Sequence, residues 1–178
     1  GFCGGSFGER MNLVGGFESL LHSRFAKLQL VVRNFCRPAD EVGQQIKPND
    51  YTKLDDPMEV FGADTFLCFF GYNESFAGAK GVAKFKEDYA KYLDTMAAHY
   101  PRDDTKAAPR FVLISPAAVE GANDGFLPDG KKENANLKLY TDAVVEVAKA
   151  RGLAFIDLFT DTDALFAKDH GRQYTVTG

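Results

Sequence analysis

The chain has 178 residues, of which 45% are hydrophobic and 26% are charged, as in an ordinary globular domain. Its 21 basic and 25 acidic side chains give a formal net charge of −4, which argues against a nucleic-acid-binding protein, since such proteins usually carry a basic face. The longest uninterrupted apolar run, from Phe66 to Phe70, is far shorter than the roughly 18 residues of a membrane span.

Five segments along the chain have the composition of β-strands. Residues 64–71 form a near-continuous apolar run that ends in glycine, which is typical of a strand covered on both faces. The other runs are apolar or β-branched and are bounded by polar residues or proline. Strands are therefore expected at 28–34, 64–71, 110–115 and 153–159, with the tail of an earlier strand at 1–5.

Apolar residues between these strands recur at helical spacing. Helices are expected from Met11 to Phe25, weakened by two adjacent glycines, from Val82 to Met96, and from Leu137 to Val147. Strands that alternate with helices predict an α/β fold, with three α/β/α layers around a parallel, doubly wound sheet of flavodoxin-like strand order 2-1-3-4-5. Residues 1–178 are expected to form a single domain.

Three positions that suit catalysis follow successive strands of this sheet. Ser6 follows the first strand, Ala39 lies in the turn after the second and Asn73 follows the third, at intervals of 33 and 34 residues. In the expected order these strands are neighbours about 4.8 Å apart, so a hydroxyl, a backbone amide and a side-chain amide are expected to converge. That set suits acyl transfer, in which a nucleophile attacks a carbonyl and N–H donors stabilise the oxyanion.

Short blocks at these positions resemble those of the SGNH (GDSL-type) hydrolases. Residues 4–7 (GGSF) resemble the family's first block, Gly-Asp-Ser-Leu, residues 34–41 (NFCRPADE) resemble its second, and residues 71–74 (GYNE) resemble its third, Gly-x-Asn-Asp. The segments RNFCRPADEV and CFFGYNESF are most similar to a planctomycete-like subgroup. The resemblance implies a serine esterase in which Ser6 forms an acyl-enzyme, with the N–H groups of Ser6 and Ala39 and the Asn73 side chain as the oxyanion hole.

The chain also departs from the family pattern. Gly5 replaces the aspartate of the first block, Ala39 replaces a glycine and Glu74 replaces an aspartate. The final Asp-x-x-His block, which supplies the triad acid and base, is absent up to Gly178, and we expect it beyond that residue in a sequence truncated at both ends. His170 is a weak substitute, because the residue three positions earlier is alanine. A serine without a base is a poor nucleophile, so the chain alone is expected to be nearly inactive.

Structural interpretations stand beside these roles. Ser6 could cap the helix that follows it, and Asn73 could hold a turn after the third strand. Asp40 and Glu74 are interpreted as groups that hold the loops of the site, and Asp157 as a group that serves the turn after the last strand. The remaining candidates are interpreted as surface groups: Arg10, Arg37, His22 and His99.

No cofactor or metal is expected. The glycines at positions 1, 4, 5 and 8 lack GxGxxG spacing, and Asn34 stands where a dinucleotide site would have an acid. The three cysteines lack CxxC spacing and are interpreted as buried thiols.

The expected partner is a small acyl ester, with acylated carbohydrate as one candidate. A second hypothesis is a non-catalytic SGNH-like binding or accessory domain of a larger protein; the sequence indicates neither compartment nor oligomeric state.

Overall fold

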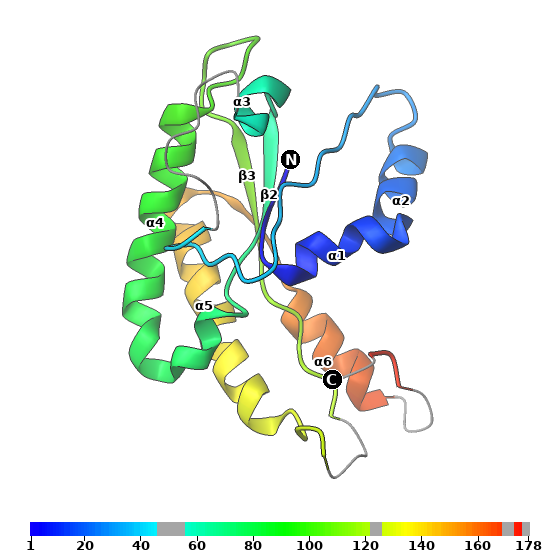
Figure 1. Ribbon diagram of the computed structural model, residues 1–178, viewed down its shortest axis with the longest axis vertical. Helices are drawn as coiled ribbons and strands as arrows, with labels where there is room; N and C mark the ends of the chain where they lie inside the picture. Colours follow the sequence, from blue (N-terminus) through cyan, green and yellow to red (C-terminus); the bar gives the residue numbers. More distant parts are fainter. Residues whose placement is uncertain (46–55, 122–125, 169–172, 176–178) are drawn as a thin grey trace.

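The computed structural model describes residues 1–45, 56–121, 126–168 and 173–175 (Figure 1). Within this part of the chain, four parallel strands form one sheet in the order β1-β2-β3-β4. The strands are β1 (Phe2–Gly4), β2 (Thr65–Phe69), β3 (Arg110–Ile114) and β4 (Ala154–Ile156). The register pairs Cys3 with Cys68 and Cys68 with Leu113. The expected parallel α/β sheet is confirmed.

Helices cover both faces of the sheet (Figure 1). The helices α4 (Val82–His99) and α5 (Lys131–Arg151) pack against one face, in a core that includes the buried side chains of Phe66 and Cys68. Phe2 and Phe69 point to the other face, where residues of α1 (Ser6–Val14) and the first residue of α6 (Leu158–Lys168) pack against them. Successive strand residues thus alternate between two covered faces, which confirms the three-layer α/β/α architecture.

The prediction of a full strand at 28–34 is wrong. Only Asn34 pairs with the sheet, in an isolated parallel bridge to Phe2, flanked by hydrogen bonds from Phe2 N to Arg33 O and from Phe35 N to Phe2 O, both 2.9 Å. Leu28 and Val31 are 56% and 75% exposed, and Val32 alone among residues 28–33 packs against the buried core, so little packing stabilises a longer ladder. The bridge still lies on the side of β1 away from β2, as the order 2-1-3-4-5 requires.

The first expected helix is two helices, α1 and α2 (Gly16–Arg24). They are separated by Gly15, whose φ of 57° is left-handed and ends α1, because glycine adopts this conformation without steric cost. The helices expected from Val82 to Met96 and from Leu137 to Val147 are confirmed within α4 and α5, the second of which ends at the left-handed Gly152. Two shorter elements complete the fold, α3 (Pro57–Phe61) and the 3₁₀ helix η1 (Glu74–Gly81).

The strand expected at 153–159 is shorter than its apolar pattern indicated. It ends at Ile156, and α6 begins at Leu158. Asp157 causes this early end, since its carboxylate accepts hydrogen bonds from the Thr160 N–H at 2.9 Å and the Thr160 hydroxyl at 2.8 Å, in the manner of a helix N-cap. The structural interpretation of Asp157 is confirmed. No helix within the described residues combines the length and the hydropathy needed to cross a membrane.

Candidate active site

Ser6 lies at the carboxyl end of β1, where it is the first residue of α1. The N-cap position belongs to Gly5, so the Ser6 hydroxyl does not cap this helix. Among the described residues neither this hydroxyl nor the Ser6 N–H has a hydrogen-bond partner, and the residue is half-buried. The first N–H groups of a helix have no partner within the helix, so this N–H is available to bind an anion.

The turn at Gly5 contacts the other two predicted site segments. A Cβ atom added to Gly5 would lie 3.2 Å from the Asp40 carbonyl oxygen and 3.4 Å from Asn73 Nδ2. Asn73 Nδ2 also donates a hydrogen bond to the Asp40 carbonyl at 3.3 Å. The residue before Ser6, the residue after Ala39 and the Asn73 carboxamide are therefore within contact distance of one another. Asn73 precedes η1 and follows β2, so this contact lies at the carboxyl edge of the sheet.

Ala39 has a φ of 65°, in the left-handed region that glycine adopts without strain. The family pattern has a glycine at this position. Alanine keeps the backbone N–H, but its Cβ makes this backbone conformation strained. That N–H has no hydrogen-bond partner among the described residues. The loop is held in place from both sides, because Arg37 N donates to Gly4 O at 3.0 Å and Asn34 Nδ2 donates to Gly8 O at 2.6 Å.

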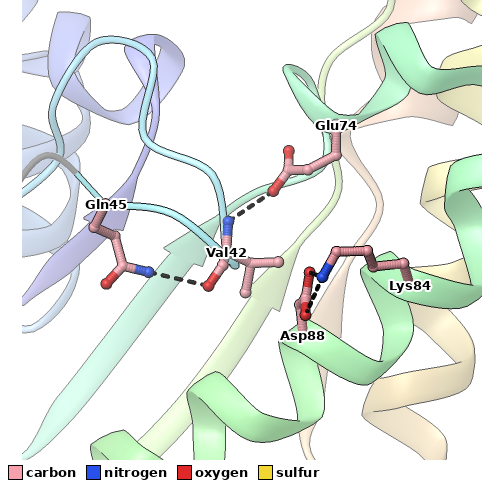
Figure 2. Close-up of polar contacts among 5 residues, drawn as sticks. All are labelled: Val42, Gln45, Glu74, Lys84 and Asp88. Atoms are coloured by element: carbon pink, nitrogen blue, oxygen red, sulfur yellow. Dashed lines mark hydrogen bonds and ion pairs between the residues drawn. The ribbon is translucent and has the colours of Figure 1, made fainter.

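Glu74 joins two loops of the site (Figure 2). Its carboxylate accepts hydrogen bonds from Val42 N at 2.8 Å and from Gly71 N at 2.9 Å. Burial raises the pKa of Glu74 above its ordinary value, and hydrogen bonds from three backbone N–H groups, those of Val42, Gly71 and Glu74 itself, offset only part of this effect. The interpretation of Glu74 as a residue that holds the loops is confirmed.

A second set of polar groups at this edge was missed by the sequence analysis. Ser115, directly after β3, accepts a hydrogen bond from Phe159 N at 2.9 Å, and the Asn134 side chain bonds both the N–H and the carbonyl of Val119, at 2.8 and 2.9 Å. The buried Glu120 carboxylate accepts hydrogen bonds from the backbone N–H groups of Tyr174 and Thr175, at 2.9 and 2.7 Å. Each pair is separated by 15 to 55 residues, so no local sequence signal could have indicated it.

The described residues include no group of three or more histidine, cysteine or carboxylate side chains that could hold a metal ion. His22 and His99 are exposed on α2 and α4, which confirms their interpretation as surface groups, whereas His170 lies outside the described residues. All three cysteines are buried, as expected, and none forms a disulfide. Burial raises the pKa of the Cys68 thiol well above its ordinary value, so this sulfur is protonated and unreactive.

No protein family model matches the chain, and no curated protein matches its sequence. Solved structures nevertheless share its fold. A catalytic mutant of the acetylxylan esterase Axe2 from Geobacillus stearothermophilus superposes with a TM-score of 0.64 at 11% identity, over 94% of this chain and 79% of that one. A lipase/acylhydrolase from Enterococcus faecalis gives a TM-score of 0.57 at 20% identity, over 84% of this chain and 69% of that one.

A third similar structure is that of BT4096, a gut microbial diltiazem-metabolizing enzyme, with a TM-score of 0.65 at 20% identity. The match covers 94% of this chain and only 39% of BT4096, so the chain spans well under half of that protein's length. At these identities the comparisons establish the fold, an α/β/α architecture shared with structures of esterases and acylhydrolases.

Proposed function

We propose that the chain belongs to the SGNH (GDSL-type) esterases and that Ser6 is its nucleophile. The observation that carries the proposal is the contact among Gly5, Asp40 and Asn73 at the carboxyl edge of the sheet, which brings the three predicted site segments together. The similar Axe2 structures support a serine and an acid, since they include catalytic mutants with serine-to-alanine and aspartate-to-alanine changes. The segments RNFCRPADEV and CFFGYNESF favour the planctomycete-like subgroup.

In this proposal Ser6 Oγ attacks the ester carbonyl carbon and the alcohol leaves, so that an acyl-enzyme forms and water then releases the acid. The developing oxyanion is bound by the N–H groups of Ser6 and Ala39 and by Asn73. Asn73 Nδ2 uses one N–H on the Asp40 carbonyl, which leaves its second N–H for the oxyanion. Removing one such donor typically costs about 3 kcal/mol of transition-state stabilisation.

The proton acceptor is proposed to come from an Asp-x-x-His block beyond Gly178. A serine hydroxyl is a weak nucleophile until an adjacent base takes its proton. The two histidines of the described residues are exposed on α2 and α4, and neither makes a hydrogen bond with Ser6. We therefore expect slow turnover by the 178-residue chain and fast turnover by protein that includes the block.

The proposed substrates are small acyl esters, with acetylated carbohydrate favoured. Two of the similar structures, Axe2 and AlAXEase, are acetylxylan esterases, and the AlAXEase match covers 94% of this chain at 17% identity with a TM-score of 0.61. The half-buried position of Ser6 suits a small acyl group on a larger alcohol that remains partly in solvent.

Turnover of p-nitrophenyl acetate by protein that includes the Asp-x-x-His block tests the nucleophile. The Ser6→Ala change is expected to lower kcat about 10³-fold or more, because the covalent step is lost. A matched control is Ser23→Ala, an exposed serine on α2 that should leave the rate unchanged. Equal rates for wild type and Ser6→Ala would reject Ser6 as the nucleophile.

The second candidate function is a non-catalytic binding or accessory domain. It is favoured by Gly5, which leaves no carboxylate beside Asn73 where the first block has an aspartate, and by the strain at Ala39. A serine-directed phosphonate distinguishes the two functions. Labelling of Ser6 in protein that includes the block supports the esterase, and its absence at every concentration supports the binding domain.

A further inference from the structure

A small pocket lies between the start of η1 and the first turns of α5, and neither Ser6 nor Asn73 is among its lining residues. Its volume is about 110 Å³, and its lining includes Tyr72, Phe76, Lys132, Glu133 and Asn136. The two elements that line the pocket are held together, because η1 packs against α5 and the Tyr140 hydroxyl of α5 donates a hydrogen bond to the Gly78 carbonyl of η1 at 3.1 Å. The space is somewhat smaller than the cavity of about 150 Å³ that takes one benzene ring, so a six-membered ring bound here keeps part of its surface in solvent.

Two exposed aromatic side chains stand on one wall of this pocket. The rings of Tyr72 and Phe76 pack edge to face, with centroids 5.7 Å apart and planes at 90°. Tyr72 is 44% exposed and Phe76 is 71% exposed, so both keep ring surface in contact with solvent. A ligand with an apolar face gains by covering such surface.

The opposite wall, formed by α5, carries the polar side chains of Lys132, Glu133 and Asn136 beside Leu137. These three polar side chains make no hydrogen bond or ion pair with any other described residue. Together they offer an ammonium donor, a carboxylate acceptor and an amide that does both. A ligand that suits this pocket has an apolar face for the aromatic wall and several hydroxyls for the polar wall, which is the chemistry of a sugar ring.

The pocket adjoins the candidate active site through the backbone. Tyr72 directly precedes Asn73, and its carbonyl accepts a hydrogen bond from the Ser75 hydroxyl at 2.6 Å, which holds the turn. We propose that this pocket binds a hydroxylated six-membered sugar ring, the alcohol part of an acylated carbohydrate. The assignment of the ring to an ester substrate rests on the proposed function, whereas the binding of the ring does not.

The test is the binding of xylobiose, an unacylated sugar, to the Ser6→Ala protein, followed by NMR. We expect resonances of Tyr72, Phe76 and Asn136 to shift on titration. Phe76→Ala should weaken binding about 3- to 10-fold, because the ring loses one aromatic contact. Phe76 is largely exposed, so its truncation leaves the core intact. The matched control is Phe25→Ala, a 45% exposed phenylalanine at the end of α2, which should leave the affinity unchanged.

Three outcomes would overturn the proposal: no shift at saturating xylobiose, shifts that Phe76→Ala leaves unchanged, or benzyl alcohol binding there as well as xylobiose does. The last outcome would show an apolar pocket with no preference for hydroxyls. Because the serine is absent from the protein tested, a failure here leaves the esterase proposal standing. Conversely, if xylobiose binds but p-nitrophenyl acetate turnover does not depend on Ser6, the sugar-binding proposal is supported and the esterase proposal is rejected.

Discussion

Ala39 is the one site residue whose backbone conformation is strained. Its φ of 65° costs an alanine about 1–2 kcal/mol, whereas glycine avoids this cost but loses about 0.5–1 kcal/mol through its freedom in the unfolded chain. We therefore expect Ala39→Gly to raise the free energy of unfolding by about 0.5–1 kcal/mol, measured by urea denaturation. Ala90→Gly in the middle of α4 is the control and should lower it by about 1 kcal/mol. A loss of stability at both positions would contradict the strain at Ala39.

Glu74 links stability to pH. Burial raises its pKa in the folded protein, so the folded state binds a proton at this group more readily than the unfolded state does. The contribution of the group to stability is therefore fully present below its unfolded pKa, about 4.5, and is lost as the pH rises through the raised folded pKa. We expect the free energy of unfolding of the wild type, relative to Glu74→Gln, to decline across this interval.

The measurement is urea denaturation of both proteins from pH 4 to pH 8. Glutamine has one acceptor oxygen, so it keeps only one of the hydrogen bonds from Val42 and Gly71. The Glu74→Gln protein should therefore have a free energy of unfolding about 1–3 kcal/mol lower than that of the wild type. Parallel pH profiles for the two proteins would show that Glu74 does not titrate as its burial implies. Asp88→Asn is a control, since that carboxylate pairs with the exposed Lys84 (Figure 2).

At the scale of elements, Glu120 ties a segment near the chain end to the loop after β3. Its carboxylate accepts from the N–H groups of Tyr174 and Thr175 and from the Thr175 hydroxyl, the last at 2.8 Å. Hydrogen bonds to a charged group contribute about 1.5–3 kcal/mol, so Glu120→Ala should speed hydrogen exchange of these two amides about 10-fold or more. Glu87→Gln on the exposed side of α4 is the control, and unchanged exchange in Glu120→Ala would contradict the anchoring role.

The segment 28–34 shows why composition does not by itself make a strand. Its β-branched residues predict extended backbone, but a strand also needs a neighbour on its hydrogen-bonding edge and a surface to cover. Only Asn34 has both, through its bridge to Phe2 and its hydrogen bonds to Gly8 and Cys36. The element order was therefore predictable at this edge of the sheet, whereas the length of the pairing was not.

In the fold as a whole, the core between the sheet and α4 and α5 contains the Tyr89 hydroxyl, which is buried without a hydrogen-bond partner among the described residues. Tyr89 is fully buried and packs edge to face on Phe70 at 5.7 Å. We expect Tyr89→Phe to raise the free energy of unfolding by about 1 kcal/mol, because an unsatisfied polar group is removed from the core.

Tyr140→Phe is the matched control in the same core. The Tyr140 hydroxyl donates to the Gly78 carbonyl, so its removal should lower the free energy of unfolding by about 1 kcal/mol. Urea denaturation of both variants measures the two effects. A loss of stability in Tyr89→Phe similar to that in Tyr140→Phe would show that the Tyr89 hydroxyl has a partner in solution.

Periodicity along the chain was enough to predict the alternation of strands and helices and the two covered faces of the sheet, and the restricted crossovers of parallel strands predicted the strand order. The sequence also predicted that the segments around Ser6, Ala39 and Asn73 would meet, and the contact of Gly5 with Asp40 and Asn73 agrees with this. The folded chain was needed to show which polar groups already have hydrogen-bond partners, as the Glu74 and Glu120 carboxylates do, and where a pocket remains between η1 and α5. The Glu74–Val42 and Glu120–Thr175 hydrogen bonds join residues 32 and 55 positions apart, so they depend on packing that no short stretch of sequence encodes.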